Sequence, residues 1–177
     1  MRVVAFLRAV MPTGLNRIPK MSQLVDILSM AGYKHVQTYI QSGNIILDTE
    51  KSKVATAEDI RMLIKESIGA DLHVIMKSVD ELGRAINESP YRDTDDPTCV
   101  FLVLSNNILD PVPVHELQQT DFGQEKLFFG KESIHLWLPW DAKPKRLNNA
   151  FLEKRLGIVS TMRNIRVATK IYELAIK

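Results

Sequence analysis

Residues 38–47 read TYIQSGNIIL, in which two apolar runs meet at the polar centre Gln-Ser-Gly-Asn. Two strand-forming runs joined by so short a polar segment predict a β-hairpin. A glycine in the first position of a two-residue loop favours a type II′ turn. We therefore expect strands over residues 35–42 and 45–49, with Gly43 and Asn44 at the tip of the hairpin and a positive φ at Gly43.

The turn type also sets the register of the predicted hairpin. With Gly43 and Asn44 at the tip, Ser42 pairs with Ile45 and Ile40 pairs with Leu47. A slip by one residue would mix apolar and polar side chains on both faces, so the turn and the hydrophobic pattern agree. The face toward the helices is expected to carry Val36, Thr38, Ile40, Ile45 and Leu47.

The hairpin belongs to a longer alternation of strands and helices. We expect a strand over residues 3–7, a helix from residue 21 that ends at Gly32, a helix over residues 53–68 closed by Gly69, and a strand over residues 72–76. With the hairpin between the helices, the order is βαββαβ, which is the order of a ferredoxin-like domain. The capping box Ser-Val-Asp-Glu at residues 78–81 opens a further helix.

The same order recurs beyond the stretch SPYRDTDDPT. That stretch, residues 89–98, has two prolines and no apolar periodicity, which is typical of a linker. We therefore predict an α+β fold of two tandem ferredoxin-like (βαββαβ) halves, each followed by an extra helix, over residues 1–88 and 99–177. The elements expected in the second half cover residues 99–104, 114–119, 126–129, 133–138, 147–156 and 158–162, with a final helix at 167–174.

Size and composition indicate a globular protein. A chain of 177 residues with 45% hydrophobic residues can bury a sizeable core, and a net charge of +2 alone indicates no dedicated nucleic-acid or membrane partner. No run approaches the roughly 20 apolar residues of a membrane span. The single cysteine, Cys99, suits a reducing cytosol and lies in the apolar run TCVFLVL, where we expect it to be buried. We expect a soluble, cytoplasmic protein.

The sequence carries no recognisable catalytic constellation. Its four histidines stand far apart, and none has a Cys, His, Asp or Glu at metal-ligand spacing on the same element. A nucleophile elbow, a phosphate loop and a dinucleotide fingerprint are all missing. We therefore expect no metal, no cofactor and no catalytic residue, and favour a protein that is non-enzymatic or weakly enzymatic.

One edge of the first predicted sheet gathers polar side chains. In a βαββαβ sheet the end of the first strand, the end of the second and the start of the third lie at the same edge. The loop over residues 9–19 and the start of the first helix lie there too, and exposed N–H groups at a helix start favour an anion. The plainer alternative is a solvated loop edge, with Arg8 in an exposed ion pair with Asp48. For a small polar or anionic ligand, the predicted contacts are Arg8, Asn16, Arg17, Gln41, Ser42 and Asn44.

A second candidate site and two alternative functions concern the C-terminal part. Arg163 and Asn164 form the second candidate, where the last strand meets the last helix. Residues 89–142 carry three Lys or Arg against nine Asp or Glu, whereas residues 143–177 carry nine against two. These segments either neutralise each other on one folded surface or leave the basic segment 143–170 to bind nucleic acid.

The other alternative is a protein–protein adaptor whose exposed sheet face is its interface. The two tryptophans, Trp137 and Trp140, are expected to fill the contact between the halves rather than to stack on bases.

Three stretches resemble a known family. They read LRAVMPTGLNRIPKMSQLVDIL (residues 7–28), VQTYIQSGNIIL (36–47) and TMRNIRVATKIYELA (161–175). They resemble a bacterial family described as domain of unknown function 1697 (DUF1697), over essentially the full chain. The first loop of that family usually reads like RGINVGGKN. The resemblance implies a small cytoplasmic bacterial protein of two ferredoxin-like halves and no known activity. In the first loop Arg8, Gly14 and Asn16 match the family, while Ala9, Met11, Pro12 and Thr13 depart from it.

Overall fold

A computed structural model describes residues 1–93 and 96–177 of the chain. It is a mixed α+β structure whose described residues form two four-stranded antiparallel sheets and six helices. The chain divides into two compact units, residues 1–80 with 173–177 and residues 81–172. The predicted linker, residues 89–98, therefore lies inside the second unit, and its residues 94–95 lie outside the described part of the chain.

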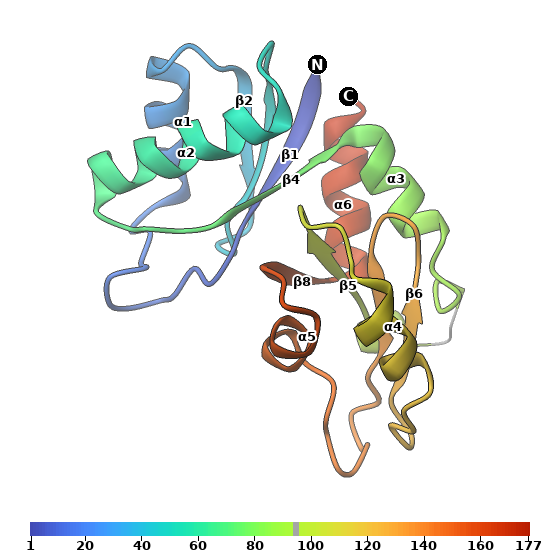
Figure 1. The fold of residues 1–177 in the computed structure, drawn as a ribbon. Helices are drawn as coiled ribbons and strands as arrows, with labels where there is room; N and C mark the ends of the chain where they lie inside the picture. The colour runs from blue at the N-terminus through green and yellow to red at the C-terminus, as the bar shows by residue number, and fades with distance from the viewer. Residues whose placement is uncertain (94–95) are drawn as a thin grey trace. The chain divides into compact units, whose positions relative to one another are not determined.

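The first unit contains one sheet and two helices. Its strands follow the order β2-β3-β1-β4, and all three neighbouring pairs are antiparallel. Helices α1 and α2 cover one face of this sheet (Figure 1). The elements are β1 (Arg2–Leu7), α1 (Met21–Met30), β2 (Lys34–Tyr39), β3 (Asn44–Asp48), α2 (Lys53–Ile68) and β4 (Val74–Ser78).

The core of the first unit forms between the sheet and these helices. Leu24 and Leu28 of α1 and Ile60 and Ile64 of α2 are fully buried in one cluster with alternate side chains of the strands. Burial of each such side chain stabilises the fold by roughly 1.5–3 kcal/mol. The side chains that alternate with them along the strands are buried as well, so both faces of this sheet are apolar. These second-face residues are Val4, Phe6, Ile46 and Ile75.

Helix α2 has the bounds predicted from its pattern. Its start is capped by Ser52, whose Oγ accepts a hydrogen bond from the backbone N–H of Ala55 at 3.2 Å. Its end is Gly69, which has a φ of 84° in the left-handed region that favours glycine. Local signals at both ends therefore fix this helix.

The hairpin exists, but its predicted register is wrong. Tyr39 pairs with Asn44 and Thr38 with Ile45, so residues 40–43 form the connection and the turn is longer than two residues. Ile40, which was expected on the inner face, has a φ of 51° and is 47% exposed. The positive φ expected at Gly43 is confirmed at 72°.

The physical reason for the longer turn is the side chain of Asn44. This residue is the first of β3 and is fully buried. Its Nδ2 group donates to the carbonyl oxygen of Tyr39 at 3.0 Å and to Oγ of Ser42 at 2.9 Å. A buried amide needs such partners, and these bonds close the wider turn from inside.

Strand β2 lies at the edge of the first sheet and is irregular. Its pairing with β3 shifts between Lys34 and Gln37. His35 lies inside this shift and has a φ of 53°. The edge strand is therefore bent rather than flat.

The second unit repeats the arrangement. Its sheet has the order β6-β7-β5-β8, again with antiparallel neighbours. Most of α3 and α6 belongs to this unit, and a Cβ atom added to Gly83 of α3 would lie 2.8 Å from the ring of Tyr172 of α6. The elements are α3 (Val79–Asn87), the 3-10 helix η1 (Pro97–Cys99), β5 (Val100–Ser105), α4 (Pro111–Gln118), β6 (Lys126–Phe129), β7 (Ile134–Trp137), α5 (Asn149–Leu156), β8 (Ser160–Asn164) and α6 (Ile165–Ala175).

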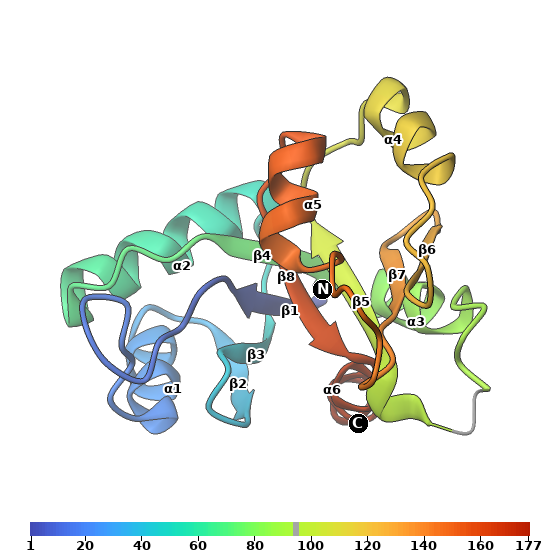
Figure 2. The ribbon, with the colours of Figure 1, turned by 90° about the horizontal axis from the view of Figure 1, so that it is seen from below.

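Helices α4 and α5 cover one face of the second sheet (Figure 2). Leu117 of α4 and Leu152 of α5 are buried against Val103 and Leu136 of the strands. Cys99 is buried with a free thiol, as predicted. In the described part of the chain, no helix combines the length and the hydrophobicity that crossing a membrane requires.

Candidate functional site

The predicted ligand edge of the first unit lies where the topology places it, but its amide groups are used internally. Nε2 of Gln41 donates to the carbonyl oxygen of Ile18 at 3.1 Å, which ties the hairpin tip to the first loop. The amide of Asn44 holds the turn through Tyr39 and Ser42. These side chains therefore have a structural role that the sequence did not reveal.

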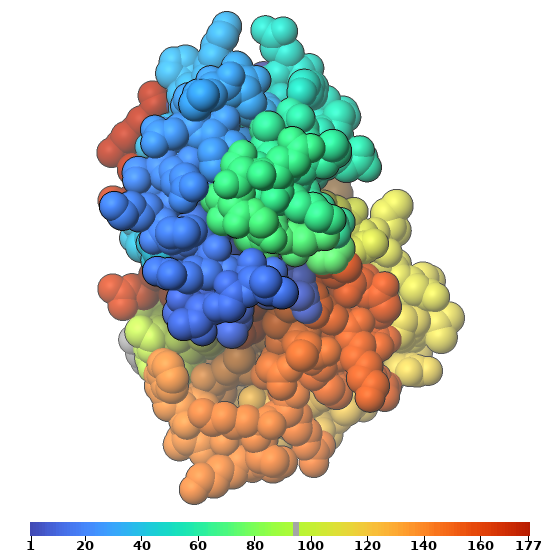
Figure 3. All heavy atoms as spheres, turned by 90° about the vertical axis from the view of Figure 1, so that its left-hand side faces the viewer, coloured from blue at the N-terminus to red at the C-terminus, as the bar shows by residue number. Residues whose placement is uncertain are grey.

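The cationic part of this edge is carried by the first loop. Backbone N–H of Met11 donates to the carbonyl oxygen of Asn16 at 3.0 Å, so the loop closes on itself. Arg17 is exposed, and Arg8 and Asn16 are half-buried. In Figure 3 the atoms of the first loop, in dark blue, lie on the surface of the molecule. Lys20 precedes α1 without a side-chain cap. Ligand binding at this edge stays a prediction.

The alternative ion pair of Arg8 with Asp48 is wrong. Asp48 lies at the other end of the sheet, where it pairs in register with Arg2. The Nε atom of Arg2 lies 2.9 Å from Oδ1 of Asp48, and Nδ1 of His35 lies 2.7 Å from its Oδ2.

Arg163 and Asn164, the second predicted site, are both built into the second unit. Nδ2 of Asn164 donates to three carbonyl oxygens at 3.0–3.1 Å, and its Oδ1 accepts from the backbone N–H of Arg166 at 3.0 Å. Arg163 is buried, and its Nη1 donates to Oγ1 of Thr161 at 2.6 Å. Burial lowers the pKa of Arg163 to about 10. These contacts stabilise the junction of β8 and α6. The carbonyl partners of Asn164 belong to Pro97, Thr98 and Val100.

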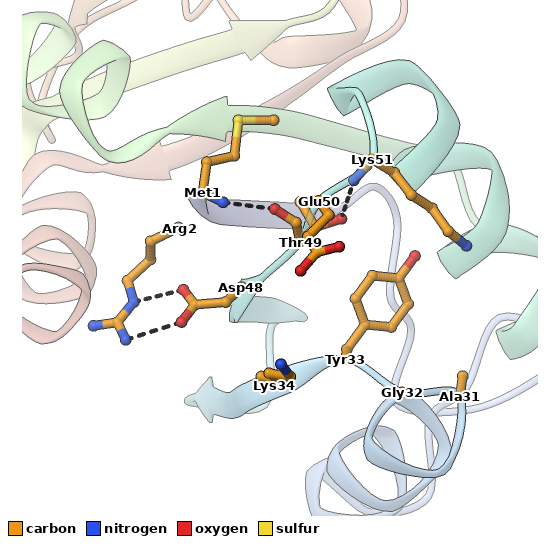
Figure 4. A pocket seen from close by; sticks show the side chains of 10 residues that line it. All are labelled: Met1, Arg2, Ala31, Gly32, Tyr33, Lys34, Asp48, Thr49, Glu50 and Lys51. Carbon is orange, nitrogen blue, oxygen red and sulfur yellow. Dashed lines mark hydrogen bonds and ion pairs between the residues drawn. The ribbon is translucent and has the colours of Figure 1, made fainter.

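A cavity of about 720 Å³ lies at the opposite edge of the first sheet, and we call it the Tyr33 pocket (Figure 4). Three separate segments build it, the start of β1, the turn from α1 into β2, and the end of β3 with the residues that follow. Its lining residues are Met1, Arg2, Ala31, Gly32, Tyr33, Lys34, Asp48, Thr49, Glu50 and Lys51.

Several charges around the Tyr33 pocket neutralise each other. Arg2, and after it His35, hold the pKa of Asp48 below its usual range. Nζ of Lys51 lies 2.6 Å from Oδ2 of Asp59, which also accepts a hydrogen bond from the Tyr33 hydroxyl at 2.5 Å. Burial, followed by the bond to Asp59, raises the pKa of Tyr33, so its hydroxyl stays protonated.

Two side chains of opposite charge that line the Tyr33 pocket are not compensated by another described residue. Within residues 1–93 and 96–177, no hydrogen bond or ion pair is found for the side chain of Glu50 or of Lys34. In Figure 4 the carboxylate of Glu50 projects from the end of β3 into the space beside Tyr33. The pocket thus combines an apolar wall with the carboxylate of Glu50 and the ammonium group of Lys34, beside the α-ammonium group of Met1, which donates to the carbonyl oxygen of Thr49 at 2.6 Å.

Sequence reasoning missed the Tyr33 pocket because its parts are far apart in the chain. The run Asp-Thr-Glu-Lys at residues 48–51 reads as a solvated turn, and residues 31–34 read as a helix end. Only the sheet pairing of Arg2 and Lys34 with Asp48 brings the segments together. Among the described residues, no group of three or more His, Cys, Asp or Glu is arranged to hold a metal ion.

Comparison with known protein families shows the family to which the chain belongs. The sequence profile described as "Protein of unknown function (DUF1697)" matches residues 1–135. The chain belongs to the DUF1697 family. This confirms the resemblance seen in the hairpin and the first loop.

A solved structure is similar to this DUF1697 protein over nearly its whole length. The structure of the conserved bacterial protein SP0830 from Streptococcus pneumoniae has a TM-score of 0.79 and 21% sequence identity. The match covers 99% of this chain and 98% of that one, which shows a shared fold. No curated protein matches the chain.

Proposed function

We propose that this DUF1697 protein binds a small zwitterionic molecule in the Tyr33 pocket. The proposal keeps the function expected from the sequence, binding of a small polar ligand, and moves it from the hairpin edge to the opposite edge of the sheet. The observation that carries it is the presence of Glu50 and Lys34, two uncompensated opposite charges, in one cavity of about 720 Å³. Small-molecule sites have volumes of roughly 300–1,000 Å³.

The neighbouring charges favour a zwitterion over a simple anion. Asp48 is compensated by Arg2, and Lys51 by Asp59, so these groups contribute little net field. A ligand ammonium group would be paired by Glu50 and a ligand carboxylate by Lys34. The thioether of Met1, the ring of Tyr33 and the methyl group of Ala31 would contact the apolar part.

A thermal-shift panel tests the proposal. Free L-leucine and L-glutamine carry both charges, whereas their N-acetyl and amide derivatives each lose one charge. A ligand at 100 times its Kd stabilises a protein by about 2.7 kcal/mol, which corresponds to roughly 5–10 °C in Tm for a chain of this size. We expect a shift with at least one free amino acid and a smaller shift with both of its derivatives.

Substitutions of Glu50 and Lys34 test whether the ligand binds in the Tyr33 pocket. Glu50→Gln should abolish the preference for a free amino group, and Lys34→Met should abolish the preference for a free carboxylate. Glu66→Gln on α2 and Lys154→Met on α5 remove the same charges away from the pocket and serve as matched controls. Shifts that are unchanged in Glu50→Gln and Lys34→Met, or no shift with any compound, would contradict the proposal.

A second candidate function is binding of single-stranded nucleic acid by the loop before α5. The observation in its favour is Trp140, which is 67% exposed and has Nζ of Lys145 at 5.9 Å from its ring centroid. An exposed aromatic ring with Lys145 over it, in a segment that also carries Lys143 and Arg146, suits base stacking with phosphate contacts.

Fluorescence tests this second candidate. The protein has two tryptophans, so Trp137→Phe leaves Trp140 as the sole indole. Quenching by a single-stranded oligonucleotide, weakened steeply by added salt, would support binding through this loop. Unchanged fluorescence at low salt would exclude it.

We also infer that both halves are ferredoxin-like and related by duplication. In support, each sheet places the strands of its half in the order second, third, first, fourth. We further infer a cytoplasmic location. A single cysteine cannot form a disulfide within the chain, which suits a reducing compartment.

A further inference from the structure

We propose a second ligand site in the second unit, a groove for a small aromatic anion. A cavity of about 370 Å³ lies beside α4 and α5 and is distinct from the Tyr33 pocket. We call it the Phe122 groove. It is lined by Leu117, Thr120, Phe122, Arg146, Phe151 and Arg155.

The floor of the Phe122 groove is apolar and aromatic. Leu117 is 1% exposed and Phe122 is 8% exposed, so both are anchored in the core of the second unit. The rings of Phe122 and Phe151 meet edge to face, with centroids 6.0 Å apart and planes at 85°. A third ring placed on this pair would find one ring face and one ring edge, the arrangement that aromatic groups prefer.

Two guanidinium groups stand at the groove. Nη1 of Arg146 donates to the carbonyl oxygen of Asp121 at 3.3 Å, and Nη2 of Arg155 donates to Oε2 of Glu116 at 3.3 Å. A guanidinium has five N–H donors in a planar fork. The contacts found in the described part of the chain use one nitrogen of each arginine, which leaves donors for a ligand oxyanion.

The backbone at Arg146 is held in place by a buried acid. Glu125 is 4% exposed, and its Oε2 accepts hydrogen bonds from the backbone N–H groups of Arg146 at 2.7 Å and Leu147 at 2.9 Å. A charged acceptor with two backbone donors makes a strong anchor. The base of the Arg146 side chain is therefore fixed before any ligand arrives.

Size and charge define the ligand class. The guanidinium of Arg155 is paired with Glu116, whereas that of Arg146 contacts a backbone carbonyl oxygen and no carboxylate in the described part of the chain, so it can pair with a ligand anion. A volume of about 370 Å³ is at the small end of ligand sites and suits one ring. The groove therefore fits an aryl phosphate, sulfonate or carboxylate, with its ring on Phe122 and its oxyanion between the two arginines.

Titration calorimetry with phenyl phosphate tests the proposal, with phenol and inorganic phosphate as the two halves of the probe. We expect phenyl phosphate to bind more tightly than either half. Arg155→Gln should weaken it by about tenfold or more, which is the loss of one charged hydrogen bond. Lys154→Gln, on the same helix and outside the groove, removes the same charge and should change the affinity less than about twofold.

Glu116→Gln separates a binding role of Arg155 from a structural one. This variant removes the carboxylate that competes with the ligand for the Arg155 guanidinium, so phenyl phosphate should bind more tightly. Equal weakening by Arg155→Gln and Lys154→Gln would overturn the proposal, because net charge alone would explain it. Equal affinities for phenyl phosphate and inorganic phosphate, or weaker binding in Glu116→Gln, would also overturn it. Every variant here lies in the second unit, so the outcome is independent of the Tyr33 pocket.

Discussion

Replacement of Gly43 by alanine should destabilise the first unit more than its small size suggests. Two separate terms add at this position. Gly43 has a φ of 72°, which costs an alanine roughly 1–2 kcal/mol. A Cβ atom there would also lie 2.7 Å from Cβ of Leu7 and 2.8 Å from Cγ2 of Val10.

The steric term arises because Leu7 cannot move away. Leu7 is 1% exposed in the core, and its backbone N–H donates to the carbonyl oxygen of Gly43 at 2.8 Å. Forcing an extra carbon into a packed core costs roughly 1–3 kcal/mol. Gly43→Ala should therefore lower the free energy of unfolding by roughly 2–5 kcal/mol.

Gly69→Ala is the matched control. Gly69 has a φ of 84°, but nothing lies within 4 Å of its added Cβ atom, so only the backbone term of roughly 1–2 kcal/mol applies. Urea denaturation of both variants measures the two losses. Equal losses would refute the steric reasoning, and an unchanged midpoint for Gly43→Ala would refute the close approach of the hairpin to β1.

Three further predictions concern pH and capping. Burial lowers the pKa of His135 from 6.5 to about 4, so the unfolded state binds the proton first as pH falls. The contribution of His135 to the free energy of unfolding should be fully present above pH 6.5, and about 3 kcal/mol of it should be lost between pH 6.5 and pH 4. Melting curves measured across this pH range should show the loss in the wild type and a weaker pH dependence in His135→Gln. Arg61, then Lys65, lowers the pKa of Asp71 to about 2, so its stabilising contribution should be complete above 3.8 and be lost as pH falls through about 2. NMR titration should show the pKa of Asp71 rising in Arg61→Gln. Ser52→Ala removes the N-cap of α2 and should lower the free energy of unfolding, measured by urea denaturation, by about 1 kcal/mol.

The parts of the fold that sequence predicts well are those with local causes. Helix α2 has an apolar face, a serine cap and a glycine stop within one continuous segment, and its bounds were predicted to the residue. The hairpin was found for the same reason. Its register was not, because the buried amide of Asn44 and the close approach of Leu7 decide the turn, and neither is visible in ten residues of sequence.

The candidate sites were harder to predict because they depend on pairing between distant segments. The predicted edge was assembled correctly from topology, yet Gln41 bonds to Ile18 and Asn44 bonds within the turn. The Tyr33 pocket was missed because Arg2 and Lys34 meet Asp48 only through the strand register. The sequence around a charged residue does not show whether a residue from a distant segment will pair with it in the fold.

The irregular edge strand β2 has a consequence for how this protein behaves at high concentration. A flat edge strand offers a row of free N–H and C=O groups that a neighbouring molecule can extend into a larger sheet. The shift between Lys34 and Gln37 and the positive φ of His35 interrupt that row in the first unit. In the second unit the edge strand β6 keeps a regular register through Lys126, Leu127, Phe128 and Phe129, and Phe128 is 41% exposed. Of these two edge strands, β6 is therefore the one open to strand addition by a neighbouring molecule, and a lysine in place of Phe128 should oppose that association.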